Sequence, residues 1–466
     1  MKYLVLVCRL IVGALFIVSG LIKANDPIGF GIKLDEYFAE DALNLVFLAP
    51  YSMALGILAC VAEIVLGFAV LFGGRMKLAV AALLWLTIFF GWLTAYTGHC
   101  NDMHDAGTPM KYTVVENGET IEKEKHCVSD CGCFGDAMKG SMGRSLTPWE
   151  SFTKDLILFI LIIPIAIASF RKNGLKWNTA ADDKLLLPLG LLLVAFFSWV
   201  FTWWGPLWFT LIGMAGYLAI KRIFGGHPPA PLKGGQKAEW VTALWATFIS
   251  LLFIWWCLEH NPVRDYRPYA EGKSILAQKN DKKDPIIESF LVYKNKQTGE
   301  EKEYSASNYP WNDSVWVATW EFVKQRNNII DPGIQSQVSD FALTDKDGND
   351  LTEGILTEVQ PVLVIIVKSV KDADTEHMKE IAELCRVAQE KSWYVYGASA
   401  SDWTEIESFR HDHALNFEFT QCDEVTLKTI NRSNPGIMLL KEGVVKGQWH
   451  HNDTPTFDDA AAAAAP

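Results

Sequence analysis

The sequence predicts a polytopic α-helical membrane protein that carries an α/β domain at its carboxyl end. Half of the 466 residues are hydrophobic, yet 21% are charged. Long apolar runs fill the first part of the chain, and several reach the ~20 residues that a helix needs to cross a bilayer. From about residue 336, strand-like and amphipathic helical segments alternate, which is typical of a sheet covered by helices.

The apolar runs predict seven transmembrane helices, because each is long and almost free of charge. The expected spans are 3–22, 51–73, 77–97, 154–170, 184–203, 205–221 and 239–258. Lys and Arg are concentrated in the loops 74–76, 171–183 and 222–238. Since short basic loops stay in the cytoplasm, we expect an inner-membrane protein with a cytoplasmic N-terminus. The loop 98–153 and the chain beyond residue 259 would then be periplasmic.

The overall charge excludes one class of partner. The formal net charge is −12, whereas nucleic-acid binding needs a basic face or stripe, so no nucleic acid is expected. The expected partners are the lipid bilayer and envelope proteins, either thioredoxin-like proteins or subunits of an envelope complex.

Two charged residues fall inside expected spans. Arg9 shares a helix face with Gly13 and Gly20, and Glu63 lies in the middle of the second span. A charge at that depth costs at least ~2.5 kcal/mol and usually has a partner. We therefore expect Arg9 and Glu63 to form an intramembrane polar pair. It is either a structural ion pair or the polar lining of a pocket for a small molecule such as a quinone, which would serve as electron acceptor.

These residues belong to a longer pattern that resembles a known family. The pattern is Arg9-x3-Gly13-x2-Phe16-x2-Ser19-Gly20-x2-Lys23-x2-Asp26-Pro27, followed by Glu63 and Gly67 in the second span. It resembles the DoxX family of four-helix membrane proteins. The motif Cys131-Gly132-Cys133-Phe134-Gly135-Asp136 resembles the related MauE branch. The resemblance implies a four-helix bundle over about residues 3–170 and, for the MauE branch, a role in thiol-disulfide chemistry of the envelope.

Four of the nine cysteines lie in the loop 98–153, namely Cys100, Cys127, Cys131 and Cys133. Three interpretations remain open. Cys131 could form a catalytic redox pair with Cys133 or with Cys127, and Cys100 and Cys127 could serve as relay or resolving partners. Cys100 could instead form a structural disulfide with one of the other three. The four thiolates could also bind zinc, although their spacing matches no common zinc finger.

The start of the fourth span favours the redox interpretation. Thr147-Pro148-Trp149-Glu150 reads as a capping box with proline at the first helical position. The helix would therefore begin close behind Cys133. A helix N-terminus lowers the pKa of a nearby thiol and favours the thiolate.

The last part of the chain predicts a second known fold. Strands are expected at Val362–Val367, Tyr394–Ser399 and Gly436–Leu440, with helices between them. This order, with Pro435 before the last of these strands, resembles the thioredoxin fold in its AhpC/TSA peroxiredoxin-like branch, where such a proline is cis. The segment Lys368–Asp374, where that fold carries its cysteines, has none.

The predicted organisation has five parts. A DoxX/MauE-like bundle occupies 1–170, further transmembrane helices 171–258, a connecting region of unassigned fold 259–335, a thioredoxin-like domain without a CxxC motif 336–455, and a tail 456–466. In the connecting region we expect a hairpin from Glu288–Tyr293 and Glu301–Ser305 and a helix over 316–326.

Two functions fit these observations. The first is periplasmic thiol-disulfide chemistry through the cysteine loop, as a thiol-disulfide oxidoreductase. The second is a non-catalytic, partner-binding subunit of an envelope complex whose cysteines are structural.

Overall fold

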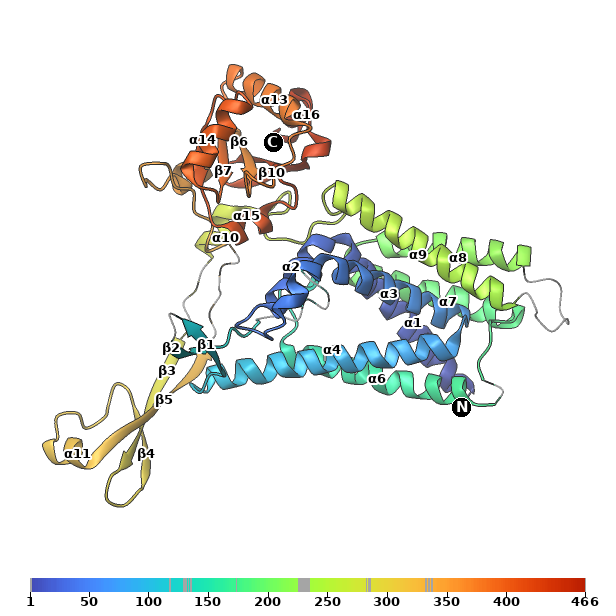
Figure 1. Ribbon diagram of the computed structural model, residues 1–466, viewed down its shortest axis with the longest axis horizontal. Coiled ribbons are helices and arrows are strands. Elements are labelled where there is room, and N and C mark those ends of the chain that lie inside the picture. The colour runs from blue at the N-terminus through green and yellow to red at the C-terminus, as the bar shows by residue number, and fades with distance from the viewer. Residues whose placement is uncertain are drawn as a thin grey trace. The chain divides into compact units, whose positions relative to one another are not determined.

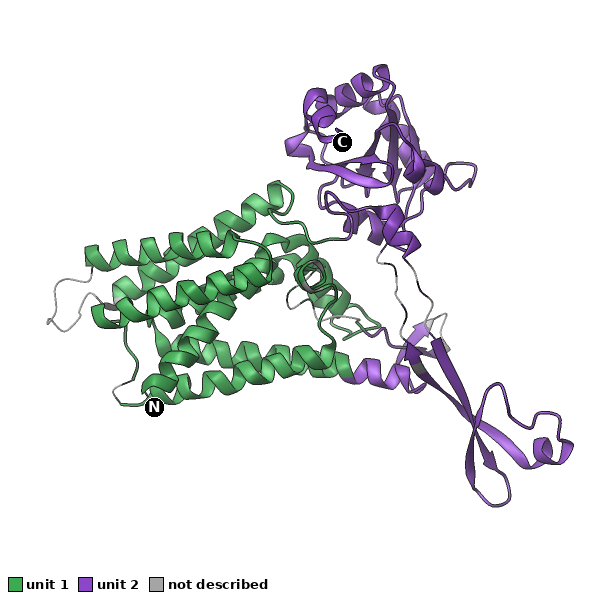
Figure 2. Ribbon diagram, turned by 180° about the vertical axis from the view of Figure 1, so that it is seen from behind, with its two compact units in different colours: residues 1–98, 128–267 green, residues 99–127, 268–466 purple. Residues whose placement is uncertain are grey.

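The computed structural model describes residues 2–116, 119–128, 132, 134, 136–172, 174–224, 235–281, 283, 286–331, 333, 336 and 338–465 (Figure 1). The chain forms two compact units, which Figure 2 shows in green and purple. Unit 1 comprises residues 1–98 and 128–267, and unit 2 comprises 99–127 and 268–466. We describe each unit by itself.

Unit 1 is a bundle of long apolar helices. In the described chain, seven helical segments are long and apolar enough to cross a membrane, as predicted. They are α1 (Lys2–Asn25), α3 (Ser52–Phe72, continuous with the 3-10 helix Val46–Tyr51), α4 (Met76–Asp105), α6 (Pro148–Phe170), α7 (Ala180–Val200), α8 (Gly205–Phe224) and α9 (Gly235–Glu259). The protein is therefore a polytopic membrane protein.

Two further helices lie between these spans. Helix α2 (Pro27–Phe38) was not predicted, although its start has a clear signal. Asp26 caps it by accepting a hydrogen bond from the Gly29 amide, and Pro27 occupies the first helical position. A short helix α5 (Ala137–Met142) precedes α6. Helix α6 begins with the predicted capping box between Thr147 and Glu150.

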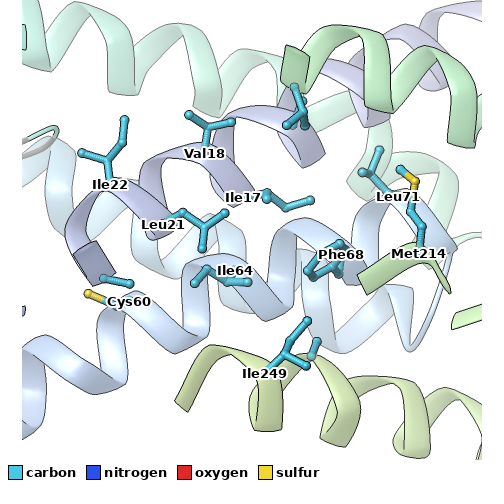
Figure 3. Close-up of a cluster of buried hydrophobic side chains, with 14 of the residues drawn as sticks. Ile17, Val18, Leu21, Ile22, Cys60, Ile64, Phe68, Leu71, Met214 and Ile249 are labelled. Atoms are coloured by element: carbon cyan, nitrogen blue, oxygen red, sulfur yellow. The ribbon is translucent and has the colours of Figure 1, made fainter. Parts of the chain in front are cut away.

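Helices α1 and α3 pack closely because glycines lie at their contact. A Cβ atom on Gly20 would lie 2.7 Å from Cγ1 of Ile64, and one on Gly67 would lie 2.8 Å from the backbone nitrogen of Ile17. Either distance is shorter than real Cβ contacts allow, so a side chain at these positions would push the helices apart. Buried apolar side chains of α1, α3, α8 and α9 fill the core around this contact (Figure 3).

The carboxyl-terminal domain in unit 2 contains a five-stranded sheet with the strand order β10-β9-β6-β7-β8. The strands are β6 (Val362–Val367), β7 (Tyr394–Ser399), β8 (Glu418–Gln421), β9 (Gly436–Lys441) and β10 (Val444–His450). Strands β6, β7 and β8 are parallel, while β9 and β10 are antiparallel to their neighbours. Helices α13 (Met378–Glu390) and α14 (Trp403–Asp412) make the crossovers. This is the thioredoxin arrangement that the sequence predicted.

The sheet is covered on both faces, which explains why β6 is continuously apolar. Leu363, Ile365 and Val367 pack against α13, α14 and the last helix, α16 (Phe457–Ala463). The alternate residues of β6 pack on the other face, against helices α10 (Ile275–Asn280), α12 (Thr352–Thr357) and α15 (Glu424–Ile430). Because successive side chains of a strand point to opposite faces, both sets must be apolar here.

The domain begins earlier and ends later than the sequence suggested. Tyr269 and Ile275, from the expected connecting region, are buried in its core. The amide of Ile275 donates to the carbonyl of Gly443, and that of Val445 donates to the carbonyl of Lys273. The expected tail 456–466 forms α16, whose Ala460 is fully buried. The small alanine side chains let this helix pack against the core of the domain.

A three-stranded antiparallel sheet is inserted after α10. Its order is β4-β3-β5, formed by β3 (Ile286–Asn295), β4 (Glu301–Ser305) and β5 (Trp320–Asp331). The predicted hairpin is thus confirmed, but the predicted helix over 316–326 is wrong. Only α11 (Ser314–Thr319) is helical, and β5 pairs along ten residues of β3. Pairing with a distant strand outweighs the weak local helical pattern.

Candidate functional site

The membrane unit contains a buried ion pair between α1 and α3. Lys23 Nζ lies 2.5 Å from Oε1 of Glu63, and both side chains are almost completely buried. Lys23 also donates to Ser19 Oγ at 3.2 Å, and its ammonium lies 5.4 Å from the centre of the Phe90 ring. The close approach of the two glycine-bearing helices brings the lysine to the carboxylate.

The predicted pair of Arg9 and Glu63 is wrong. Arg9 instead donates to the carbonyls of Val70 and Leu71 at the end of α3 and to Oδ1 of Asn178 at 2.7 Å. The prediction overlooked Lys23, which lies on the same face of α1 as Arg9 but four turns further along. Lys23 reaches the depth of Glu63 directly, while the guanidinium of Arg9 satisfies carbonyls at the end of α3.

A small cavity adjoins the Lys23–Glu63 pair. Side chains of α1, α3, α4 and α6 line it, together with Phe134 of the cysteine loop. About 50 Å³ of it is open to the centre of a water molecule. A water needs about 10–15 Å³ by that measure, so the cavity has room for a few water molecules. Most of its wall is apolar, and its polar groups are concentrated at two charged pairs.

The second charged pair is formed by neighbours on α6. Lys154 Nζ lies 2.9 Å from Oδ1 of Asp155 and 5.2 Å from the centre of the Phe134 ring. In the described part of the chain, neither Oε2 of Glu63 nor Oδ2 of Asp155 has a hydrogen-bond donor, and both atoms are buried. A buried carboxylate oxygen without a donor is costly. The cavity therefore combines two lysine donors, two acceptors in need of donors and an apolar wall.

One disulfide is present in the described chain, between Cys100 and Cys127. Cys100 lies in the last turns of α4, and Cys127 follows the hairpin of β1 (Lys111–Glu116) and β2 (Glu119–Glu124). The disulfide therefore joins the end of α4 to the segment that follows the β1–β2 hairpin. Of the predicted alternatives, a disulfide from Cys100 within the loop is confirmed, with Cys127 as its partner.

The predicted catalytic pair, Cys131 and Cys133, lies outside the described residues. The predicted zinc site of four thiolates is wrong for this state of the chain, because Cys100 and Cys127 are bonded to each other. Across the residues that the structure does place, no group of three or more His, Cys, Asp or Glu side chains is arranged to hold a metal ion.

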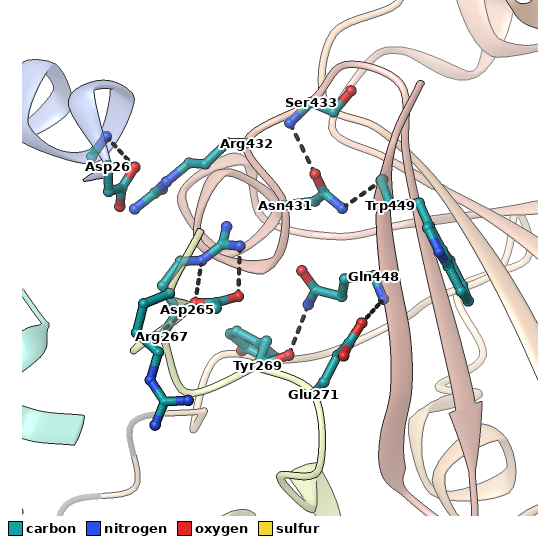
Figure 4. A network of polar contacts seen from close by, with 12 residues as sticks. Asp26, Asp265, Arg267, Tyr269, Glu271, Asn431, Arg432, Ser433, Gln448 and Trp449 are labelled. Carbon is teal, nitrogen blue, oxygen red and sulfur yellow. Dashed lines mark hydrogen bonds and ion pairs between the residues drawn. The ribbon is translucent and has the colours of Figure 1, made fainter. Parts of the chain in front are cut away.

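The thioredoxin-like domain contains the predicted proline, and the loop Lys368–Asp374 that packs on it has no cysteine. The Asn434–Pro435 peptide bond is cis, as the resemblance implied. The loop after β6 packs on this turn, since the Asp374 amide donates to the Asn434 carbonyl and Asn434 Nδ2 donates to the Ser369 carbonyl. Asn431 supports the turn by bonding to Ser433 and to the carbonyl of Trp449 (Figure 4).

The two cysteines of this domain are poorly placed for redox chemistry. Cys385 lies on the buried face of α13, and burial strongly raises the pKa of its thiol. Cys422 follows β8, and burial raises its pKa to about 11. Because the thiolate is the reactive form, both are inert near neutral pH.

Three charged residues of the cavity were not predicted from the sequence, namely Lys23, Lys154 and Asp155. Lys23 was part of the quoted family pattern, but no partner was assigned to it. Lys154 and Asp155 lie one turn beyond the capping box of α6, where a charged pair is easily read as the polar start of a helix. Only the packing of α6 against α1, and the cavity that the two helices share with Glu63 of α3, show that these charges face inward.

The fold and the site define a polytopic membrane protein with a thioredoxin-like domain. Residues 1–101 match the family described as methylamine utilisation protein MauE, so the predicted MauE resemblance is confirmed for this region. The broader resemblance to DoxX stays a prediction. Residues 287–332 match a domain of unknown function, DUF8463, which coincides with the inserted three-stranded sheet.

Solved structures are similar to part of the chain. One is a secreted Mycobacterium tuberculosis disulfide oxidoreductase homologous to E. coli DsbE, with 18% identity, 27% of this chain and 94% of that chain covered, and a TM-score of 0.22. Another is StoA from Bacillus subtilis, with 13% identity, 27% and 96% covered, and a TM-score of 0.21. A third is a thiol:disulfide interchange protein from Bacteroides sp., with 13% identity, 26% and 81% covered, and a TM-score of 0.21. No curated protein matches the chain.

Proposed function

We propose that the protein carries out thiol-disulfide exchange through Cys131 and Cys133, coupled to the cavity beside Lys23 and Glu63. One observation carries this proposal. Phe134 directly follows Cys133 in the sequence, and its ring forms a wall of the cavity next to Lys154. A change at these cysteines would therefore be felt at the buried charges.

The chemistry requires an acceptor. Oxidation of two thiols to a disulfide releases two electrons and two protons. A quinone is the acceptor class whose polar groups the cavity suits, since Lys23 and Lys154 can donate to carbonyl oxygens while the unpartnered oxygens of Glu63 and Asp155 can accept from hydroxyls. When bound, a quinone would supply the two-electron acceptor. A ring exceeds the space for a few waters, so side chains such as Phe134 would have to move.

The proposed location is the inner membrane, with the cysteine loop and the thioredoxin-like domain in the periplasm. Arg75, Lys172 and Lys176 lie between spans on one expected side, and Lys77 lies at the start of the span that follows Arg75, which supports this orientation. Labelling whole cells with a membrane-impermeant maleimide tests it. Cysteines introduced at Lys172 and Thr298 should be protected and labelled, respectively, and the reverse pattern would overturn the topology.

Differential alkylation of the purified full-length protein tests the redox function. The protein is equilibrated with dithiol buffers of stepped potential, thiols are trapped, and each cysteine is quantified by mass spectrometry. Cys131 and Cys133 should switch together and reversibly at a potential where the protein stays folded. Cys131→Ser should leave Cys133 unable to form this disulfide, while Cys8→Ser should change nothing. Cysteines that stay locked until denaturation would refute the proposal.

A second candidate function is a non-catalytic, partner-binding subunit of an envelope assembly. It is favoured by the cysteine-free loop after β6 and by the burial of Cys385 and Cys422. The two functions differ in cells. The double variant Cys131→Ser/Cys133→Ser is expressed in a deletion strain, and the thiol state of envelope proteins is measured. If this variant restores that state as well as the wild type does, the result supports the subunit function and refutes the redox function.

A further inference from the structure

A second, separate crevice opens between the spans of unit 1, beyond Glu63 toward the carboxyl-terminal end of α3. It is lined by α3, α4 and α9, and its wall is almost entirely apolar, with Leu66, Ala69, Leu78, Ala243 and Ala246 among its members. About 110 Å³ is open to the centre of a water molecule, which is twice the value for the cavity at Glu63. All three lining helices are membrane spans.

The mouth of this crevice carries a cation. Arg75 occupies the turn between α3 and α4, and its guanidinium carbon lies 5.0 Å from the centre of the Trp240 ring. Its backbone amide donates to Oε2 of Glu239 at 2.8 Å, which fixes the turn to the start of α9. Within the described residues, the guanidinium itself has no carboxylate within ion-pair distance.

These two features call for one kind of occupant. Water is a poor filler of an apolar crevice, because it would find few hydrogen-bond partners there. A hydrocarbon chain has no such requirement, and the exposed side chains of Leu78 and Trp240 place the crevice on the lipid-facing surface. Tryptophan at the end of a span is typical of the headgroup level. The Glu239 carboxylate at this turn is bound by the backbone amide of Arg75, and the guanidinium, which forms no ion pair with the described residues, suits a phosphate.

We propose that this crevice is a binding site for an anionic phospholipid. One acyl chain lies between α3, α4 and α9, and the headgroup phosphate is bound by the guanidinium of Arg75 above the Trp240 ring. The site is independent of the thiol-disulfide function, since it shares no residue with the cavity at Lys23 and Glu63. Such a lipid would hold the turn at Arg75 against the start of α9.

Native mass spectrometry of the full-length protein tests the site. The delipidated protein in detergent is titrated with phosphatidylglycerol or with phosphatidylcholine of identical acyl chains. We expect one phosphatidylglycerol per protein to bind about tenfold more tightly than phosphatidylcholine. Arg75→Gln should remove that preference, whereas Lys172→Gln, which removes a basic residue from another loop, should keep it.

Variants that fill the crevice test the contribution of the acyl chain to binding separately from that of the Arg75 charge. Ala243→Phe should abolish tight binding of both lipids. The neighbouring Leu244→Phe is the matched control, because Leu244 is 65% exposed and lies outside the crevice, and it should bind as the wild type does. If Ala243→Phe does not fold, Ala69→Leu fills the same space from α3. Equal affinity for the two lipids in the wild type, or undiminished binding to a folded filled variant, would overturn the proposal.

Discussion

Lys23 and Glu63 form a buried ion pair at 2.5 Å between α1 and α3, with Glu63 Oε1 bound and Oε2 without a donor among the described residues. Ser19 supports the lysine from one turn earlier on α1. Neither charge is exposed to bulk solvent, because both side chains are buried to more than nine-tenths. The pair therefore depends on both members, and removing one leaves an uncompensated charge.

Loss of one member of this pair should destabilise the membrane unit strongly. We expect Lys23→Met to cost ~3–5 kcal/mol, because a single buried charge remains. The double variant Lys23→Met/Glu63→Leu should recover most of that loss. Unfolding in detergent, followed by circular dichroism, measures both. Lys33→Met is the control, since the Lys33–Glu36 pair is partly exposed and should contribute under ~1 kcal/mol. A double variant no more stable than Lys23→Met would contradict the argument.

The Cys100–Cys127 disulfide should stabilise the segment that it closes. The cysteines are 27 residues apart, and the chain-entropy model gives about 3–4 kcal/mol for a loop of that length. Peptide mapping without reduction should recover the two cysteines in one linked peptide pair. In Cys100→Ser, protease should cut the β1–β2 hairpin faster than in the wild type, whereas Cys60→Ser should leave the cutting rate unchanged. Linkage of Cys100 to another cysteine would refute the pairing.

The last helix should be essential to the thioredoxin-like domain. Ala460 is completely buried on the inner face of α16, so Ala460→Glu forces a charge into the core, and we expect a loss of at least ~3 kcal/mol. Ala462→Glu lies on the exposed side of the same helix and should cost under ~0.5 kcal/mol. Denaturant titration followed by tryptophan fluorescence compares them. Similar stability of the two variants would mean that the helix is dispensable.

The thiols of Cys385 and Cys422 should be unreactive in the folded protein. With a pKa of about 11, only about one Cys422 in a thousand is a thiolate at pH 8, and a raised pKa means fewer thiolates at any given pH. Iodoacetamide at pH 8 should therefore label neither residue until guanidinium is added. Quantification by mass spectrometry checks this. Rapid labelling of either cysteine in the native state would contradict this prediction and would mean that the thioredoxin-like domain has a reactive thiol.

The fold was largely legible in the sequence, because its signals are local and strong. Apolar runs of bilayer length identify spans without tertiary information, and the continuous apolar strand Val362–Val367 identifies a sheet covered on both faces. The predictions were wrong where the structure of a segment depends on a partner that is distant in the sequence. The segment from Trp320 is a strand because it pairs with β3. The alanine-rich end is a helix that packs against the core of the thioredoxin-like domain.

The site was less predictable, since a charge on a helix does not reveal its partner. The sequence shows Glu63 as a buried charge that requires a cation, but Arg9 and Lys23 lie on the same face of α1. Only the alignment of α1 with α3 in the membrane shows which of the two lies at the depth of Glu63. Lys154 and Asp155 could equally have been a solvated helix start. A cavity is a property of several helices at once, and no single segment records it.

By itself, the sequence determined that the chain spans the membrane several times, that four cysteines occupy one loop, and that a thioredoxin-like domain has no cysteine beside its proline. These follow from composition and order along the chain. The tertiary structure alone decided that Lys23 rather than Arg9 neutralises Glu63, that Cys100 is bonded to Cys127, and that Phe134 joins the cysteine loop to the buried charges. The physical reason is that burial makes a partner necessary, whereas three-dimensional packing decides which partner is near enough.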